Sequence, residues 1–160
     1  MLKKLKNTIE KVKECEDFAN WKSEHQEGYL VSAFYNNKIG EWQTHYYDPA
    51  NDVMAVFNIE NDVISIDSDE IFRKEKTKIN ELRLEDIKIE SVDELIKKLV
   101  DEKYNSEEEA NKIIIIQQKE FPVWNVTYVT KALNVLNVRI NAITGEIIEE
   151  HFESIMNFKK

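Results

Sequence analysis

The chain has 160 residues, 42% of them hydrophobic and 33% charged, so it can bury a real core as one domain or two joined halves. Its formal net charge is -9, spread evenly along the chain, and this acidity disfavours nucleic acid as a partner. A lone Cys15 excludes an intramolecular disulfide, and no apolar stretch approaches the roughly 20 residues of a membrane span. No signal peptide is visible, so we expect a cytoplasmic protein.

The first half of the chain has the pattern of one helix followed by four strands. Apolar residues at helical spacing predict an amphipathic helix over residues 2–20. Polar, turn-like joins separate the segments that follow, and such short joins favour antiparallel pairing of neighbouring strands. The predicted strands are Gly28–Tyr35, Glu41–Tyr47, Asp52–Ile59 and Asp62–Ile66.

A charged stretch then separates this half from the next. Residues 67–78 are predicted to be solvated, and the segment after them has only a sparse apolar set from Leu82 to Ile89. We therefore divide the chain into a first unit, residues 1–70, a junction, residues 71–90, and a second unit with a short tail, residues 91–160.

The second half again has the pattern of a helix and four strands. A capping box at Ser91 to Glu94 precedes a predicted helix from Val92 to Tyr104. Thr144-Gly145 supplies a turn before the last strand, where Gly145 can take a positive φ at little cost. The tail is predicted to add a helical turn that packs through Phe152, Ile155 and Met156. The predicted strands are Lys112–Gln118, Val123–Thr130, Asn134–Asn141 and Glu146–Glu150.

The two halves also share an internal repeat. The segment Trp42–Tyr46 (WQTHY) matches Trp124–Tyr128 (WNVTY), 82 positions later, and Val53–Ile64 matches Val135–Ile148. A repeat of this length predicts two copies of one small α+β unit, each a helix packed on an antiparallel sheet of four strands.

The repeated aromatic residues alternate along equivalent strands, and such alternation places them on one face of a sheet. We predict that this face is the core packed under each helix; the alternative is an aromatic recognition surface. Better candidates for an exposed partner-binding patch are Tyr35, His45 and Tyr47, on other faces or edges. The predicted core residues are Trp42, Tyr46, Trp124, Val126, Tyr128, Leu95 and Leu99.

Nothing in the sequence has the spacing of a catalytic, metal or cofactor site. The three histidines and Cys15 form no close ligand pair, and acidic neighbours of Cys15 disfavour its thiolate. The chain has neither a nucleophile elbow nor a glycine-rich phosphate loop. We therefore predict no enzyme, although an unfamiliar site built from Cys15, His25 and His45 stays an alternative.

Residues 91–150 resemble a PepSY domain, with its PepSY/cystatin-like arrangement of a helix on a small antiparallel sheet. The resemblance rests on the helix from Val92, the strand Pro122–Val126 and the hairpin ending in Asn141-Ala142-Ile143-Thr144-Gly145-Glu146, where Asn141 stands for the usual aspartate. The first half resembles a degenerate second copy, with Glu60-Asn61-Asp62 at the turn. This likeness implies a non-catalytic module that binds proteins and restrains peptidases, commonly in exported proteins.

The leading functional hypothesis is therefore a protein-binding or regulatory module that restrains a peptidase. The rival is a small-molecule or peptide binder that uses a cleft between the two units, since such clefts are common ligand sites. Pairing of strand edges between two copies offers a route to a homodimer, although nothing in the sequence requires one.

Overall fold

The eight strands in the described part of the chain belong to one antiparallel sheet. The computed structural model describes residues 1–60, 63–70 and 79–155. Within them the fold is α+β, and the strands lie in the order β4-β3-β2-β1-β5-β6-β7-β8. Their bounds are β1 (Tyr29–Asn36), β2 (Trp42–Asp48), β3 (Val53–Glu60), β4 (Val63–Glu70), β5 (Glu109–Gln118), β6 (Pro122–Thr130), β7 (Asn134–Asn141) and β8 (Ile147–Ser154).

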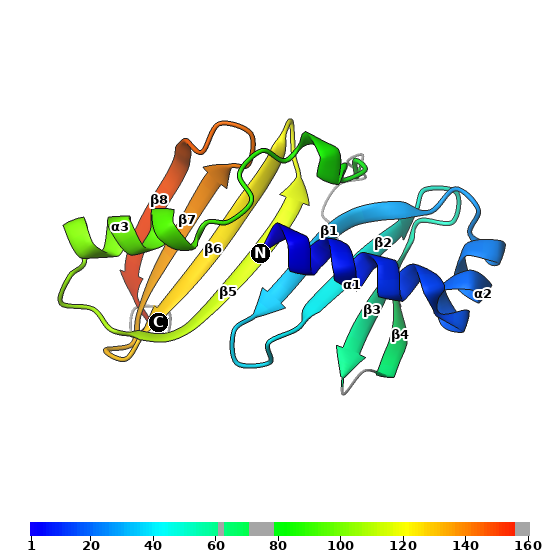
Figure 1. Cartoon of the computed structure of the whole chain (residues 1–160), viewed down its shortest axis with the longest axis horizontal. Helices are drawn as coiled ribbons and strands as arrows, with labels where there is room; N and C mark the ends of the chain where they lie inside the picture. The colour runs from blue at the N-terminus through cyan, green and yellow to red at the C-terminus, as the bar shows by residue number, and fades with distance from the viewer. Residues whose placement is uncertain (61–62, 71–78, 156–160) are drawn as a thin grey trace.

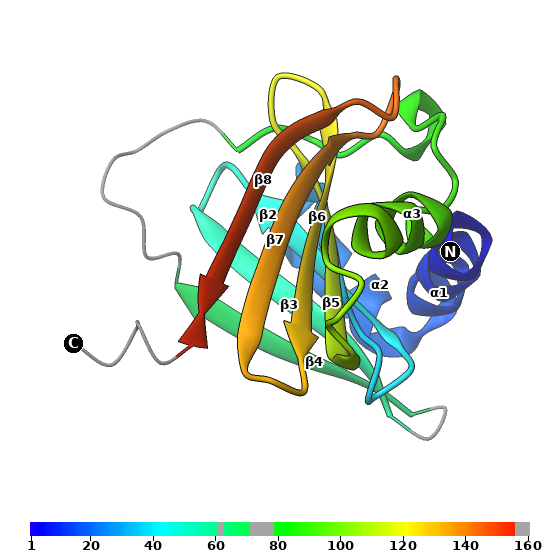
Figure 2. The same ribbon diagram turned by 90° about the vertical axis from the view of Figure 1, so that its left-hand side faces the viewer.

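The helices lie together on one face of this sheet. They are α1 (Leu2–Glu14), α2 (Glu16–Glu24) and α3 (Asp93–Lys103), with a short 3-10 turn, η1, at Leu84–Asp86. Figure 1 shows α1 across the strands of the first half and α3 across those of the second. In Figure 2 the helices are seen on one side of the sheet, and no described helix covers the other side. The fold thus has two layers, with its core between them.

The helix predicted over residues 2–20 is in fact two helices. Cys15 has an extended backbone, with φ -81° and ψ 151°, and ends α1. Its thiol sulfur then accepts a hydrogen bond from the Phe18 amide at 3.3 Å and so caps α2. The change of direction lets Trp21 join a cluster with Tyr46 and Phe57, which a straight extension of α1 would not do. No sequence pattern marks this break, because cysteine is an uncommon N-cap residue.

The strand pairings in the two halves have the same register. Thr44 lies opposite Ala33 and Phe57, and Val126, 82 positions later, lies opposite Ile114 and Val138. The halves meet where β1 pairs with β5, and this pairing is symmetric about the pair Phe34 and Ile115. One sheet therefore continues across the middle of the molecule. We call this line between β1 and β5 the seam.

The largest hydrophobic core extends across the seam. It joins Leu2, Leu5 and Ile9 of α1 to side chains of α3 and of β5 to β7. Six of the seven side chains predicted as core are buried, and Leu95 is half-buried against the same cluster. A smaller cluster around Trp21 and Phe57 fills the far end of the first half. Because one cluster includes both halves, we expect them to unfold together.

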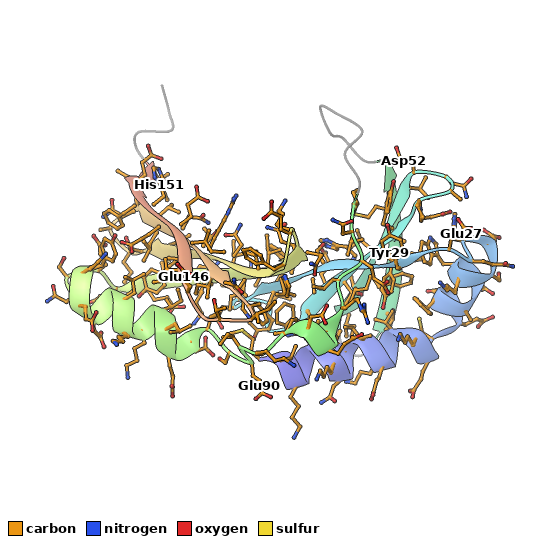
Figure 3. The ribbon with its side chains drawn as sticks, turned by 90° about the horizontal axis from the view of Figure 1, so that it is seen from above. Glu27, Tyr29, Asp52, Glu90, Glu146 and His151 are labelled. Carbon is orange, nitrogen blue, oxygen red and sulfur yellow. The ribbon has the colours of Figure 1, made fainter. Side chains whose placement is uncertain are left out.

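The described part of the predicted junction, residues 79–90, crosses the helical side of the sheet, and we call it the strap. Its apolar residues Leu82 and Ile87 are buried. The Leu82 amide donates to the Leu30 carbonyl at 2.8 Å, and the Leu2 amide donates to the Glu90 carbonyl at 3.0 Å. In Figure 3 Glu90 lies beside the start of α1. The sparse apolar set of this segment is thus part of the core, whereas residues 71–78 lie outside the described residues, as does the predicted turn at 61–62.

The helical turn predicted for the tail is wrong for its first residues. They continue the last strand, so β8 runs to Ser154, and its Phe152 lies opposite Leu136 of β7. The Phe152 ring stacks on Tyr104, with centroids 4.7 Å apart. Only Phe152 is apolar among residues 149–153, so this part of the sequence has neither the alternation of a strand nor the apolar stripe of a helix. Met156 lies outside the described residues.

Gly145 takes a left-handed backbone conformation in the turn before β8, with φ +80°. The side-chain oxygen of Asn141 accepts hydrogen bonds from the Ile143 and Thr144 amides and holds this turn. An added Cβ at Gly145 would lie 3.3 Å from Ile89. We expect Gly145→Ala to lower the free energy of unfolding by about 1–2 kcal/mol in urea denaturation. Gly145→Asn should cost less, since asparagine tolerates positive φ; equal losses would contradict the backbone argument.

Candidate functional site

The repeated tryptophans meet across the seam. Trp42 of β2 and Trp124 of β6 are 1% and 0% exposed, and their ring centroids lie 6.3 Å apart. Their surroundings differ, however. The Trp124 indole nitrogen donates to the Ile89 carbonyl at 2.9 Å, whereas the Trp42 indole makes no hydrogen bond within the described part of the chain. The strap thus covers the indole of Trp124, whereas the equivalent indole of Trp42 has no such cover.

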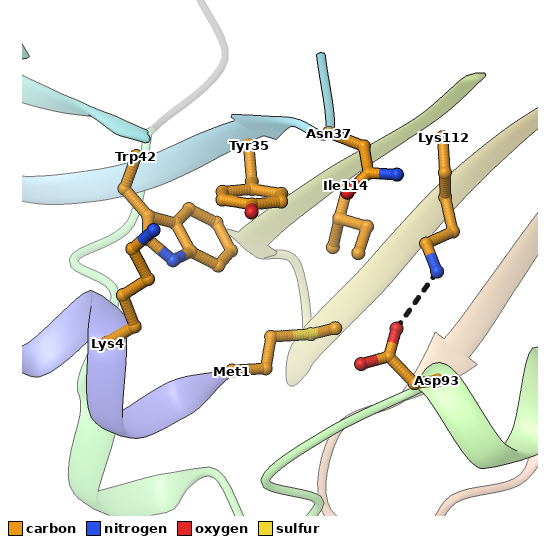
Figure 4. A pocket seen from close by; sticks show the side chains of 8 residues that line it. All are labelled: Met1, Lys4, Tyr35, Asn37, Trp42, Asp93, Lys112 and Ile114. Atoms are coloured by element: carbon orange, nitrogen blue, oxygen red, sulfur yellow. Dashed lines mark hydrogen bonds and ion pairs between the residues drawn. The ribbon is translucent and has the colours of Figure 1, made fainter. Parts of the chain in front are cut away.

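A pocket of about 310 Å³ lies beside Trp42. We call it the seam pocket, and Figure 4 shows its side chains. Trp42, Tyr35 and Ile114 form its apolar wall on the sheet, and Met1, the residue before α1, lies across from them. The ring centroids of Tyr35 and Trp42 are 5.2 Å apart, which holds the two rings as one surface. The pocket is lined by Met1, Lys4, Tyr35, Asn37, Trp42, Asp93, Lys112 and Ile114, and so draws on both halves.

The polar groups of the seam pocket carry a net positive charge. Lys4 lies with its nitrogen 5.5 Å from the centroid of the Tyr35 ring and donates to the Gly40 carbonyl. Lys112 donates to Asp93 at 3.0 Å, so these two charges offset each other. Lys4 is exposed and keeps donors available on its ammonium group. The pocket therefore suits a ligand with an apolar group beside an anionic one.

The candidate partner-binding residues do not form one patch. Tyr35 packs on the helix side, beside Trp42. His45 lies opposite Ser32 and between the buried residues Thr44 and Tyr46 along β2, so alternation puts it on the other face of the sheet. Tyr47 is only 6% exposed, and its ring packs edge-on against Tyr29. The sheet thus separates Tyr35 from His45 and Tyr47, and of the three only Tyr35 lines the seam pocket.

His45 belongs to a hydrogen-bonded line on the uncovered face of the sheet. Its Nδ1 lies 2.9 Å from the Ser32 hydroxyl, and its Nε2 lies 2.8 Å from the Gln43 side-chain oxygen. Gln43 in turn donates to Asn58. Burial lowers the pKa of His45, which favours the neutral ring. A serine–histidine pair in hydrolysis uses a carboxylate to stabilise the imidazolium, and glutamine supplies no such charge here.

His25 and Cys15 have structural partners of their own. The His25 Nδ1 lies 2.6 Å from the buried carboxylate of Asp48, and its ring stacks on Trp21 with centroids 4.9 Å apart. Cys15 caps α2. Among residues 1–60, 63–70 and 79–155, no group of three or more histidine, cysteine or acidic side chains is arranged to hold a metal ion. The set Cys15, His25 and His45, weighed as an unfamiliar site, is therefore divided among three separate environments.

Comparisons with known proteins give a fold but no family. No protein-family model matches the chain, and no curated protein matches it in sequence. A solved structure from Clostridium difficile 630, named a putative lipoprotein, is similar in fold, with a TM-score of 0.55. The similarity covers 86% of this chain and 91% of that one at 9% sequence identity, so it shows the fold alone. No helix in the described segments is long and apolar enough to cross a membrane.

Most of the seam pocket had no signal in the sequence. Lys4, Asn37, Asp93 and Lys112 are ordinary surface residue types, scattered over more than 100 positions. They come together only because β1 pairs with β5 and because the start of α1 lies beside the strap. The repeat is the sequence feature that points toward this site, because it places Trp42 and Trp124 at equivalent positions. Their surroundings can then be compared directly in the structure.

Proposed function

We propose that this protein is a non-catalytic binding module whose ligand is a peptide segment seated in the seam pocket. The observation that carries the proposal is the asymmetry between Trp42 and Trp124. The indole of Trp124 is covered and hydrogen-bonded by the strap, whereas that of Trp42 lines a pocket built from both halves. An exposed lysine at the rim favours a carboxylate next to the apolar group that contacts Trp42 and Tyr35.

The two halves are, in this proposal, copies of one PepSY-like unit. Their matching strand registers support a duplication, as does the symmetry of the β1–β5 pairing about Phe34 and Ile115. Under the PepSY resemblance the bound segment belongs to another protein, with a peptidase as the named class. The predicted cytoplasmic location stays a prediction. Pairing of two copies through β8 is disfavoured, because that edge strand carries Glu149, Glu150 and Glu153.

The proposal is tested with a minimal ligand, N-acetyl-phenylalanine, which combines an apolar ring with a carboxylate. In ¹H–¹⁵N spectra we expect the indole signal of Trp42 to shift, while that of the closed Trp124 serves as an internal control. Lys4→Met should weaken binding roughly two- to five-fold, the range for an exposed ion pair. The matched control is Lys3→Met, an exposed lysine of the same helix outside the pocket.

A second probe separates the apolar contribution from the charge. N-acetyl-phenylalaninamide lacks the carboxylate and should bind more weakly to the wild type, with no further loss in Lys4→Met. If neither probe moves the Trp42 indole signal at millimolar concentration, the seam pocket is not a binding site. Equal shifts of the Trp42 and Trp124 signals would also count against the proposal, because they would indicate non-specific contact.

A further inference from the structure

A second pocket, of about 360 Å³, lies on the other side of the Asp93–Lys112 ion pair, under α3. We call it the α3 pocket. Ile96 and Val100 form its apolar side on the helix, and Tyr128 of β6 lines it from the sheet. Acidic residues from the loop before β5 and from its first position form the rim. The pocket thus combines an apolar side with a charged lining that is mainly acidic.

Two polar groups in the α3 pocket have no partner. Tyr128 is 7% exposed, and its hydroxyl makes no hydrogen bond within the described part of the chain. Glu107 uses Oε1 to accept from Asn134 at 2.8 Å, but its buried Oε2 has no hydrogen-bond partner there. A buried acceptor without a donor costs about 1–3 kcal/mol, more when charged. Both groups line the same pocket, so one donor-bearing ligand can satisfy them together.

The electrostatics of this pocket favour a cation. Four carboxylates and two lysines line it, and one lysine, Lys112, is already paired with Asp93. Tyr128 lines the pocket together with Glu109, Asp101 and Glu107. Burial, followed by the charges of these three acids, raises the pKa of Tyr128. These carboxylates are not arranged as a metal site among the described residues. An organic cation does not require carboxylates that converge on one point, and the pocket of about 360 Å³ has room for one.

We propose that the α3 pocket binds the primary ammonium group of an alkylamine. An ammonium group has three donors, and Glu107 Oε2, the Tyr128 hydroxyl and one rim carboxylate supply three acceptors. The alkyl chain lies along Ile96 and Val100, where it replaces water against apolar surface. The ligand can be a free diamine or a lysine side chain, since both present the same group.

The equivalent position in the first half provides an internal contrast. Tyr46 corresponds to Tyr128 and lines a pocket of about 390 Å³, and its buried hydroxyl also lacks a partner in the described chain. That pocket, however, is lined by Lys13, Lys22 and Arg83 as well as by two glutamates. A cation is therefore expected at one position and not at both. This inference does not rest on the seam pocket, whose proposed ligand carries the opposite charge.

The test titrates the full chain with 1,4-diaminobutane, with N-acetyl-lysine amide and with Mg²⁺, followed by ¹H–¹⁵N spectra and calorimetry. We expect one amine site, with shifts confined to residues around Ile96, Val100 and Tyr128. Glu107→Gln should weaken amine binding roughly ten-fold, as for loss of a charge-assisted hydrogen bond, and Tyr128→Phe should weaken it less. Glu108→Gln is the matched control, since Glu108 pairs with Lys131 and lies outside the pocket.

The three titrations also distinguish the source of the ammonium group. Tighter binding of 1,4-diaminobutane than of N-acetyl-lysine amide identifies a free amine as the ligand, and the reverse identifies a lysine side chain. Equal weakening by Glu107→Gln and Glu108→Gln would show non-specific attraction to an acidic surface and overturn the proposal. So would a preference for Mg²⁺, or the absence of amine-induced shifts at tens of millimolar, in which case water alone satisfies the two groups. A lost seam-pocket response with an intact amine response would reject only the seam pocket.

Discussion

Replacement of Trp124 by alanine is expected to lower the free energy of unfolding by about 3–5 kcal/mol, the range for loss of a buried tryptophan. The side chain is fully buried, its ring contacts Trp42, and its indole nitrogen holds the strap through the Ile89 carbonyl. The truncation therefore leaves a cavity at the centre of the core and removes the donor to the Ile89 carbonyl. Because the same core includes both halves, the loss should appear as one earlier transition.

Urea denaturation followed by far-ultraviolet circular dichroism provides the measurement. The control is Ile39→Ala, because Ile39 is 68% exposed and its truncation should change stability by less than about 0.5 kcal/mol. Trp124→Phe should lie between the two, since it retains an apolar ring and loses the hydrogen bond to the strap. A loss below about 1 kcal/mol for Trp124→Ala, or two separate transitions in the wild type, would contradict a shared core.

The sequence predicted local structure well because local structure depends on local patterns. Alternation along Trp42–Tyr46 and Trp124–Tyr128 indicates the buried face of each strand, and both segments lie in strands with that face buried. The turn at Gly145 also follows from a local rule, since few residues other than glycine accept its φ. These features need no knowledge of how distant segments meet.

Features that depend on distant contacts could not be predicted. The two halves share one sheet because β1 pairs with β5. Nothing in the sequence of either strand predicts that the two strands pair with each other. The repeat predicted four strands in each half but left open whether the halves pack face to face or share one sheet, and the described strands form one sheet. The strap was missed for the same reason, because Leu82 and Ile87 are too sparse to show periodicity and are buried only by tertiary contact.

Replacement of Asp48 by asparagine is expected to cost about 1–3 kcal/mol at neutral pH, the range for a disrupted buried hydrogen-bond group. Asp48 lies at the end of β2, buried, and its carboxylate is bonded to His25 at 2.6 Å, to the Asn51 side chain at 2.7 Å and to the Ala50 amide at 2.8 Å. Both carboxylate oxygens of Asp48 accept hydrogen bonds. In asparagine one of these oxygens is replaced by an NH₂ group, which is a donor and would face a group that also donates. The contact between α2 and β2 through His25 would therefore weaken.

The pH dependence of stability distinguishes the loss of the Asp48 charge from a loss of packing. Burial by itself would raise the pKa of Asp48, but the hydrogen bonds from His25, Asn51 and the Ala50 and Asn51 amides outweigh it, and the pKa is lowered from 3.8. The folded state thus binds this proton less readily than the unfolded chain, so the stabilisation is present above the unfolded-state pKa and is lost as the pH falls through the folded-state value.

In urea titrations from pH 7 downward, the wild type should therefore lose its advantage in stability over Asp48→Asn below about pH 4. Glu102→Gln, at an exposed position of α3, should change stability little at any pH. A difference between the wild type and Asp48→Asn that stays constant into the acid range would show that shape, and not the charge of Asp48, holds α2 against the sheet.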